Sequence, residues 1–243
     1  MKCADVYNVF FDPGEVVEIR AFGLSKSNAA WEGWAGGAGV VYGYFDNAVD
    51  FGKCAEALDK AKARGIYFTL NPVNPDILAR AVNRLKAADM KTNTTQDKEI
   101  LCLRWLPIDI DAKYPHELKV SASKEEVKET IAVRKKIWAW LKDKQGFGDC
   151  IPAMSGNGGH ILYRLPDIPN SEDNILMIKN ILAVLAIKFN SKKVDIDRSV
   201  FNPARIWRLY GTTSRKGDHT EDRPHRRSYI EPKFLTSLGI NND

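Results

Sequence analysis

The sequence has few cysteines, and their spacing suits neither a zinc site nor a disulfide framework. Four occur in 243 residues, at Cys3, Cys54, Cys102 and Cys150, with no Cys-x-x-Cys pair and no histidine at zinc-ligand spacing. Scattered thiols of this kind are typical of proteins kept in a reducing compartment. The sequence therefore predicts a cytoplasmic protein without structural disulfides.

Long apolar runs, internal repeats and low-complexity tracts are also absent. No apolar stretch approaches the ~20 residues of a membrane span, and no segment resembles a signal peptide, so no membrane partner is predicted. A content of 44% hydrophobic and 28% charged residues is ordinary for a globular protein. The net charge of +5 permits a polyanionic partner without requiring one.

The first part of the chain alternates strand-like and helix-like segments and predicts an α/β module over residues 1–98. Gly65 ends a segment with helical periodicity, and Asn74-Pro75-Asp76 has the cap, first-turn proline and acid of a helix start. The polar stretch 90–98 is predicted to be a loop. The remaining expected elements are strands at 15–22, 40–45 and 66–70, helices at 51–63 and from 75 to about 85, and a loop or hairpin at 25–38.

The second part, residues 99–243, predicts the order β(105–111)–α(124–144)–β–β(151–165)–α(172–189)–β(205–210). This is the βαββαβ order of ferredoxin-like, RNA-recognition-type folds. Ser123 with Glu126 forms a capping box, and Trp138 is assigned to the buried face of the helix that follows. No disordered linker separates the two parts. The prediction is therefore a single α+β domain over 1–243, with an N-terminal module packed on a C-terminal RRM-like module.

Two acids in the middle of the chain are the first candidates for chemistry. Asp109 and Asp111 lie in a segment of strand-forming residues, so they share one face with Cα atoms about 6–7 Å apart. Adjacent carboxylates repel unless a cation lies between them, and Mg²⁺ and Mn²⁺ prefer such oxygen ligands. The alternative is a strand end running into a turn, where aspartate is common.

A glycine-rich turn, Ser155-Gly156-Asn157-Gly158-Gly159-His160, is the second candidate. Its glycines allow close backbone approach and outward-facing N–H groups, as in anion-binding nests. His160 opens a strand, so we expect the sheet to fix its ring. A plain glycine-rich hairpin remains the alternative, because the spacing fits neither a Walker loop nor a Rossmann fingerprint.

A second acidic pair, Asp195 and Asp197, precedes the most basic region of the chain. Arg205 and Arg208 begin this region, which continues to residue 227. Arginine suits bidentate phosphate contact and stacking on bases. Basic runs are often only solvated surface, but this one follows a possible metal site, which favours a nucleic acid or a nucleoside triphosphate as ligand. Three carboxylates from the two acidic pairs could bridge two metal ions that catalyse phosphoryl transfer.

Taken together, these segments resemble motifs I, II and III of the archaeo-eukaryotic primase superfamily. They are Asp109-x-Asp111, Ser155-Gly-Asn-Gly-Gly-His160, and Val-Asp-Ile-Asp197 leading into Asn-Pro-Ala-Arg-Ile. The run from Ser199 to Asp218 is similar to what primase-polymerases of plasmids, phages and CRISPR loci carry after motif III. Upstream segments around 43–46 and 65–72 are similar to that group as well, so the resemblance spans nearly the whole chain.

The resemblance implies a role for each matching residue. Asp109, Asp111 and Asp197 would be catalytic ligands of two Mg²⁺ or Mn²⁺ ions, with Asp195 as the rival for the third position. Residues implied to bind the incoming nucleotide are Ser155, Asn157, Gly158, His160, Arg205 and Arg208. The implied partners are a DNA template and primer, a dNTP or NTP, and a helicase or priming domain in a longer protein.

The implied activity is that of a DNA primase-polymerase, a divalent-metal-dependent nucleotidyltransferase that extends a 3′-hydroxyl and in some members starts primers. Two alternatives stay open at this point. A two-metal nuclease needs the same acids but has less use for a triphosphate cradle. A non-catalytic module that binds single-stranded nucleic acid could be built on the same fold.

Overall fold

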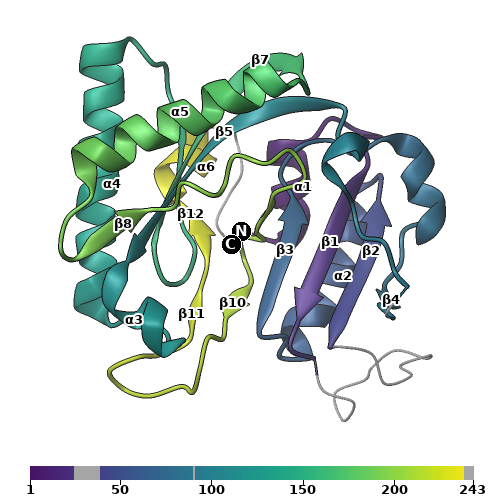
Figure 1. The fold of residues 1–243 in the computed structure, drawn as a ribbon. Coiled ribbons are helices and arrows are strands. Elements are labelled where there is room, and N and C mark those ends of the chain that lie inside the picture. The colour runs from purple at the N-terminus through teal and green to yellow at the C-terminus, as the bar shows by residue number, and fades with distance from the viewer. Residues whose placement is uncertain (25–38, 90, 238–243) are drawn as a thin grey trace.

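The computed structural model describes residues 1–24, 39–89 and 91–237, so the loop or hairpin predicted at 25–38 lies outside the described residues. The protein contains two five-stranded sheets in which neighbouring strands pair antiparallel, with helices packed on them (Figure 1). The predicted α+β class is confirmed.

The first sheet has the strand order β4-β2-β1-β3-β9. Helix α2 starts at Asn47, whose side chain accepts a hydrogen bond from the Asp50 N–H, and it contacts β1, β2 and β3 as well as α1. The bounds are α1 (Cys3–Phe10), β1 (Val17–Phe22), β2 (Val40–Phe45), α2 (Ala48–Lys60), β3 (Gly65–Thr69), β4 (Lys86–Ala87) and β9 (Ile206–Arg208).

The helix predicted from 75 to about 85 is wrong in type and length. Asn74 caps a six-residue 3-10 helix, Pro75–Arg80. Beyond it the backbone hydrogen-bonds to the edge of β2, because Tyr44 N–H donates to Ala81 O and Asn83 N–H donates to Tyr44 O. Pairing with the sheet edge therefore outweighs the helical periodicity of this segment.

The second sheet has the order β12-β6-β7-β5-β8, and α4 and α5 contact its strands on one side (Figure 1). Ser123 and Glu126 form the predicted capping box at the start of α4, and Gly146 ends the helix in the left-handed conformation, with φ of 71°. The bounds are β5 (Cys102–Ala112), α4 (Lys124–Gln145), β6 (Ile151–Met154), β7 (Gly159–Pro169), α5 (Glu172–Phe189), β8 (Val194–Ile196) and β12 (Tyr229–Ile230).

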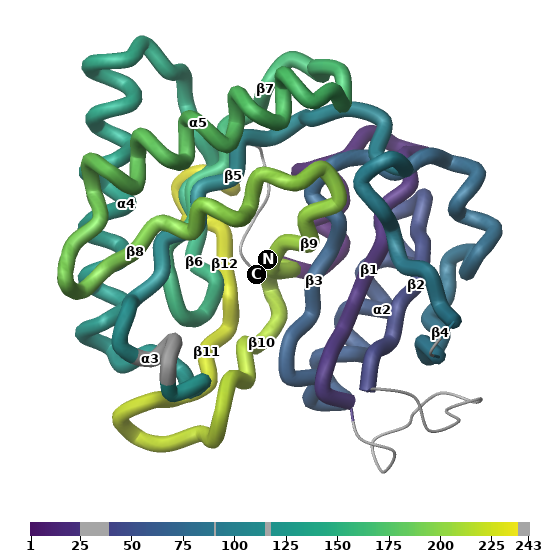
Figure 2. Tube along the Cα trace, in the orientation of Figure 1, coloured from purple at the N-terminus to yellow at the C-terminus, as the bar shows by residue number. Residues whose placement is uncertain are grey.

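Two predictions for this half need correction. The strand that closes the β5–α4–β6–β7–α5–β8 succession is 194–196, whereas the predicted strand 205–210 is short and pairs with β3 of the first sheet, Tyr67 opposite Arg208. After β8 the chain therefore crosses from one sheet to the other (Figure 2). Trp138 is 37% exposed, because the buried face of α4 is formed by Thr130, Arg134, Ile137 and Leu141.

Aromatic side chains join the two halves in a shared core. Phe10 of α1 packs against Phe68 of β3, with ring centroids 5.2 Å apart, and against Trp105 of β5 at 4.9 Å. The remaining elements are the 3-10 helix Asp97–Glu99, which overlaps the end of the loop predicted at 90–98, α3 (Lys113–Leu118), β10 (Thr213–Ser214), β11 (Arg226–Arg227) and α6 (Pro232–Ser237). Among the described residues, no helix has the length and apolar character needed to cross a membrane.

Candidate active site

Neighbouring strands bring a row of polar residues onto one face of the second sheet. Asp109 of β5 lies opposite His160 of β7. On its other side the Asp197 N–H donates to Asp109 O at 3.0 Å, which extends the β5–β8 ladder by one residue. Because directly opposed residues share a face, the three side chains lie side by side. Ile108 and Ile110 alternate with them and are fully buried.

This row forms one wall of a cleft of about 580 Å³, whose other wall is the edge of the first sheet. All the predicted site residues line the cleft except Gly158. The lining includes Asp109, Asp111, Asp197, Ser155, Asn157 and His160 on one side, and Arg64, Gly65, Tyr67, Arg205, Trp207 and Arg208 on the other, with Lys119, Ser214 and Lys216. The structure thus gathers residues that lie far apart in the sequence.

The His160 ring is held by a chain of polar contacts. Trp207 Nε1 donates to Tyr210 Oη at 2.7 Å, and this hydroxyl lies 2.7 Å from His160 Nδ1. Burial raises the pKa of Tyr210, so its proton remains available to His160. His160 Nε2 lies 3.2 Å from Asp109 Oδ1. This oxygen is nevertheless buried without a properly directed hydrogen bond from any described residue.

The carboxyl group of Asp111 has a raised pKa. Burial raises its pKa well above the usual value, and the neighbouring charge of Asp109 raises it further. Asp197 and Asp195 act in the same direction, whereas the Lys216 ammonium lowers the pKa. The repulsion predicted for the acidic pair is thus present, and a cation between the carboxylates would relieve it.

The two rivals for the third acid both lie near Asp111 but have different surroundings. Asp197 lines the cleft with Asp109 and Asp111, and one of its oxygens accepts a hydrogen bond from the Ser199 N–H at 2.7 Å. Asp195 is not among the residues that line this cleft. It lies opposite Asp111 in the ladder and faces Lys113, with Nζ 3.9 Å from its carboxylate.

The acids match Mg²⁺ or Mn²⁺ by donor type but do not form a finished metal centre. Asp109 supplies a buried oxygen without a hydrogen bond, and Asp111 lies beside it under repulsion. Within the described parts of the chain, no three His, Cys, Asp or Glu side chains are arranged to hold a metal ion. Asp197 lines the same cleft and would be the third carboxylate for an ion bound by Asp109 and Asp111.

The glycine-rich turn differs from the expected anion-binding nest. The N–H groups of Asn157 and Gly158 donate to Ser155 Oγ, at 3.3 and 2.9 Å, so they point into the turn. Asn157 connects the turn to its surroundings, since its side chain accepts from the Ala122 N–H and donates to Ser214 Oγ. The turn lines the cleft with side chains rather than with free backbone donors.

Gly158 has a packing role that the structure makes testable. A Cβ at this position would lie 2.4 Å from Ile110 O and 3.2 Å from Asp111 Oδ1. Gly158→Ala is therefore expected to push the turn away from β5 and lower the unfolding free energy by about 1–3 kcal/mol. Urea unfolding measures the change. Gly148→Ala is the matched control, because nothing lies within 4 Å of its Cβ, and equal effects of the two changes would contradict this account.

On the wall of the cleft that belongs to the first sheet, arginine side chains lie beside an aromatic ring. The Arg208 guanidinium lies over the Tyr67 ring, 4.4 Å from its centroid, and donates to Tyr67 Oη at 2.9 Å. Gly65 makes room for this ring, since a Cβ there would lie 2.7 Å from it. The Nε atoms of Arg205 and Arg208 are buried without hydrogen-bond partners among the described residues. Each arginine thus has an Nε–H donor that no described residue satisfies.

Sequence reasoning missed part of this lining. Arg64 and Lys119 come from segments without a motif, so only the tertiary fold reveals them, while Lys216 lies in the basic region that the sequence had marked. With Arg205 and Arg208 they give the cleft five cationic side chains against three acids. The cleft therefore suits a ligand that carries several negative charges, such as a polyphosphate.

The chain was compared with family models, curated proteins and solved structures. No family model matches the chain, and no curated protein matches it. Among solved structures, the chain is similar to the polymerase domain of Ligase D from Mycobacterium tuberculosis in complex with DNA. The alignment covers 98% of this chain and 86% of that chain, with 14% identity and a TM-score of 0.48. A likeness of this size assigns no function, so the function has to be argued from the residues of the cleft.

Proposed function

We propose that the protein is a metal-dependent nucleotidyltransferase, and specifically a primase-polymerase that extends a 3′-hydroxyl with nucleotides on a DNA template. The observation that carries the proposal is the cleft itself, where Asp109, Asp111 and Asp197 lie on one wall and Arg205 and Arg208 on the other. Such a cleft can place metal-binding carboxylates against a triphosphate.

The residues of the cleft have different roles in the proposed reaction. The arginines and Lys216 hold the negative charge of the triphosphate, which orients the α-phosphate toward the acids. His160, whose ring contacts Tyr210, lies beside the Asp109 carboxylate and lines the cleft. Asp109 and Asp111, with Asp197, would hold Mg²⁺ or Mn²⁺, which supplies Lewis-acid stabilisation of the phosphoryl oxygens and activates the attacking hydroxyl.

The basic region of the sequence, from Arg205 to residue 227, is proposed to contact the template and primer. Arg226 lies on β11, where burial lowers its pKa, and its Nη2 has no hydrogen-bond partner among the described residues. With the resemblance in the three motifs, this supports DNA as partner and the plasmid, phage and CRISPR branch of primase-polymerases as relatives. A helicase or priming domain elsewhere in a longer protein would extend this activity.

A template-copying assay tests the proposal. The protein is incubated with labelled primer-template, Mn²⁺ or Mg²⁺, and either dNTPs or NTPs, and a primer-free reaction runs beside it. Longer products are expected, and they must depend on the template sequence. Shortened primers would instead indicate a two-metal nuclease. Nucleic-acid binding without any product, unchanged in Asp109→Asn, would indicate a binding module and overturn the proposal.

Replacing Arg208 by lysine is expected to weaken nucleotide binding while leaving the chemical step nearly intact. Lysine keeps the charge but loses the planar group that lies over Tyr67 and the second donor for phosphate. We expect KM for the nucleotide to increase about 10-fold, with kcat changed less than about 3-fold. Steady-state kinetics at saturating primer measure both constants. Arg227→Lys, outside the cleft and 59% exposed, is the control, and an equal KM change in both variants would contradict the assignment.

A further inference from the structure

Helix α5 carries an apolar face that nothing in the described structure covers. Its buried side chains, such as Ile178, Leu182 and Leu185, pack on the second sheet. On the opposite side lie Leu176 at 51% exposure, Val184 at 52% and Ile187 at 86%, with Met177 beside them. Spacings of three, eight and eleven residues between Leu176, Val184 and Ile187 place this second set on one stripe of the helix. A helix that is apolar on both sides is normally buried on both.

The stripe borders a groove between α5 and α4. The groove has a volume of about 510 Å³, and its lining is mostly apolar, formed by Trp140, Leu141 and Phe147 from the α4 side and by Met177, Ile181, Val184 and Leu185 from α5. It does not share a lining residue with the cleft that holds the acids. A partner that covers the stripe could therefore insert side chains here and leave the cleft open.

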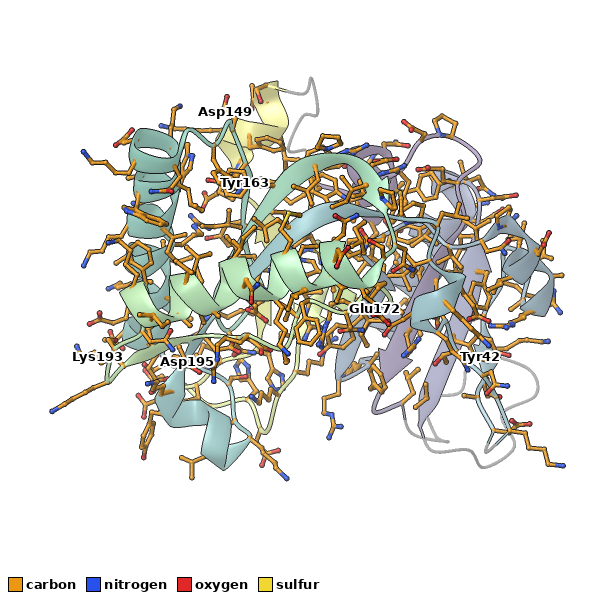
Figure 3. The ribbon with its side chains drawn as sticks, turned by 45° about the horizontal axis from the view of Figure 1, so that its top comes forward. Tyr42, Asp149, Tyr163, Glu172, Lys193 and Asp195 are labelled. Carbon is orange, nitrogen blue, oxygen red and sulfur yellow. The ribbon has the colours of Figure 1, made fainter. Side chains whose placement is uncertain are left out.

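Charges at the ends of α5 indicate which partner fits. Glu172 and Asp173 lie at the start of the helix, and Lys188 lies in its last turn, followed by Lys192. All are exposed. Figure 3 shows α5 in the foreground, with Glu172 near one end and Lys193 beyond the other. A second α5 packed antiparallel would place the acidic end of each copy against the basic end of the other.

We propose that this face is the interface of a homodimer with two-fold symmetry, in which α5 of one copy packs antiparallel on α5 of the other. Leu176 of each copy then lies near Ile187 of the other, and Asp173 lies near Lys188, because both pairs are centred on the middle of the helix. Such a contact is self-complementary, as two-fold symmetry requires. The opposed helix dipoles add to the attraction between the ends.

The area of the apolar face of α5 limits how strongly the proposed dimer is expected to associate. An 18-residue helix is about 27 Å long, and its outer face alone falls short of the ~800 Å² per partner of a standard interface. The α4 wall of the groove must therefore contribute, and a dimer with a dissociation constant in the micromolar range is expected. The proposal does not depend on the activity of the cleft.

Light scattering after size exclusion, over roughly a hundredfold range of protein concentration, tests the dimer. The wild type is expected to move from monomer to dimer within this range. A Val184→Asp, Ile187→Asp double variant is expected to remain monomeric, which corresponds to a dissociation constant at least about 100-fold higher. Val49→Asp, at a 61% exposed position on α2, is the control and should dimerise normally. Thermal unfolding of each variant shows that the fold is retained.

Charge reversal tests the antiparallel arrangement itself. Asp173→Lys and Lys188→Glu, each alone, should weaken association because like charges then meet at both ends. An equal mixture of the two variants should recover the dimer, since each repelling pair becomes an attracting one. A wild type that stays monomeric throughout overturns the proposal, and so does one that instead binds anionic phospholipid vesicles through this face. A dimer that survives the double Asp variant overturns it as well.

Discussion

Asp111→Asn is expected to abolish nucleotidyl transfer while the protein folds normally. Asparagine keeps the size of the side chain but removes the charge that would bind a divalent ion beside Asp109. We expect at least a ~1000-fold loss of kcat, which corresponds to about 4 kcal/mol of transition-state stabilisation. Single-turnover extension of a labelled primer with Mn²⁺ measures the loss.

The same change is expected to stabilise the fold in the absence of divalent ions. Burial and the charge of Asp109 raise the pKa of Asp111 in the folded state, so folding is favoured when this carboxyl is protonated and disfavoured as pH increases through its raised pKa. Asp111→Asn should therefore add about 0.5–2 kcal/mol at neutral pH, and less near pH 4. Thermal unfolding at several pH values without metal measures the difference.

Asp195→Asn provides the matched control for this prediction. Asp195 lies opposite Asp111 in the ladder but does not line the cleft, so we expect its replacement to change the extension rate less than about threefold. Two results would contradict the assignment. One is an Asp195→Asn variant as inactive as Asp111→Asn, and the other is an Asp111→Asn variant that is active and less stable than the wild type.

Local patterns in the sequence predicted much of the fold because each depends on neighbouring residues. The capping box of Ser123 and Glu126 and the stop at Gly146 define α4 through contacts between residues at most five positions apart. Elements decided by distant partners were predicted poorly. The segment after Arg80 pairs with the edge of β2, and 206–208 pairs with β3, and neither choice is visible in the periodicity of these segments.

The same difference between local patterns and distant partners holds for the candidate site. Asp109 and Asp111 were placed on one face by strand alternation alone, and the structure brings both to the cleft with Asp197. The inward-pointing donors of the 155–160 turn could not be foreseen, because Ser155 Oγ accepts them only when the turn closes. The contact of His160 with Tyr210 joins residues fifty positions apart. The sequence shows which residue types are present and how they are spaced. Long-range packing determines what each of them contacts.

Arg104→Met is expected to be the most destabilising change outside the cleft. The Arg104 side chain is only 5% exposed and joins two carboxylates. Its guanidinium donates to Glu15, just before β1, and to Asp167 of β7, at 2.7 Å and 2.6 Å from Nη2. Methionine would leave both carboxylates near the junction of the two sheets without their cation. We expect a loss of about 3–5 kcal/mol at neutral pH, or a fall in Tm of roughly 6–20 °C.

The loss of stability caused by Arg104→Met should become smaller as the pH falls. Hydrogen bonds from Arg104 hold the pKa of Asp167 well below its usual value. For Glu15 burial raises the pKa, but the hydrogen bonds from Arg104 and the Asp12 N–H, together with the Arg104 charge, lower it by more. A carboxylate with a lowered pKa in the folded state stabilises the fold above its unfolded pKa of about 4 and loses this effect as pH falls. The difference in unfolding free energy between the wild type and Arg104→Met should therefore decrease as the pH is lowered from about 7 to 3.

Urea unfolding at each pH measures this gap, with Lys142→Met as the control. Lys142 pairs with Asp149 at 3.3 Å, but the two side chains are 54% and 81% exposed, so this change should cost less than about 1 kcal/mol. A gap that stays constant with pH would mean that Arg104 acts by packing alone. A loss no larger than that of Lys142→Met would show that the Arg104 ion pairs do not hold the two sheets together.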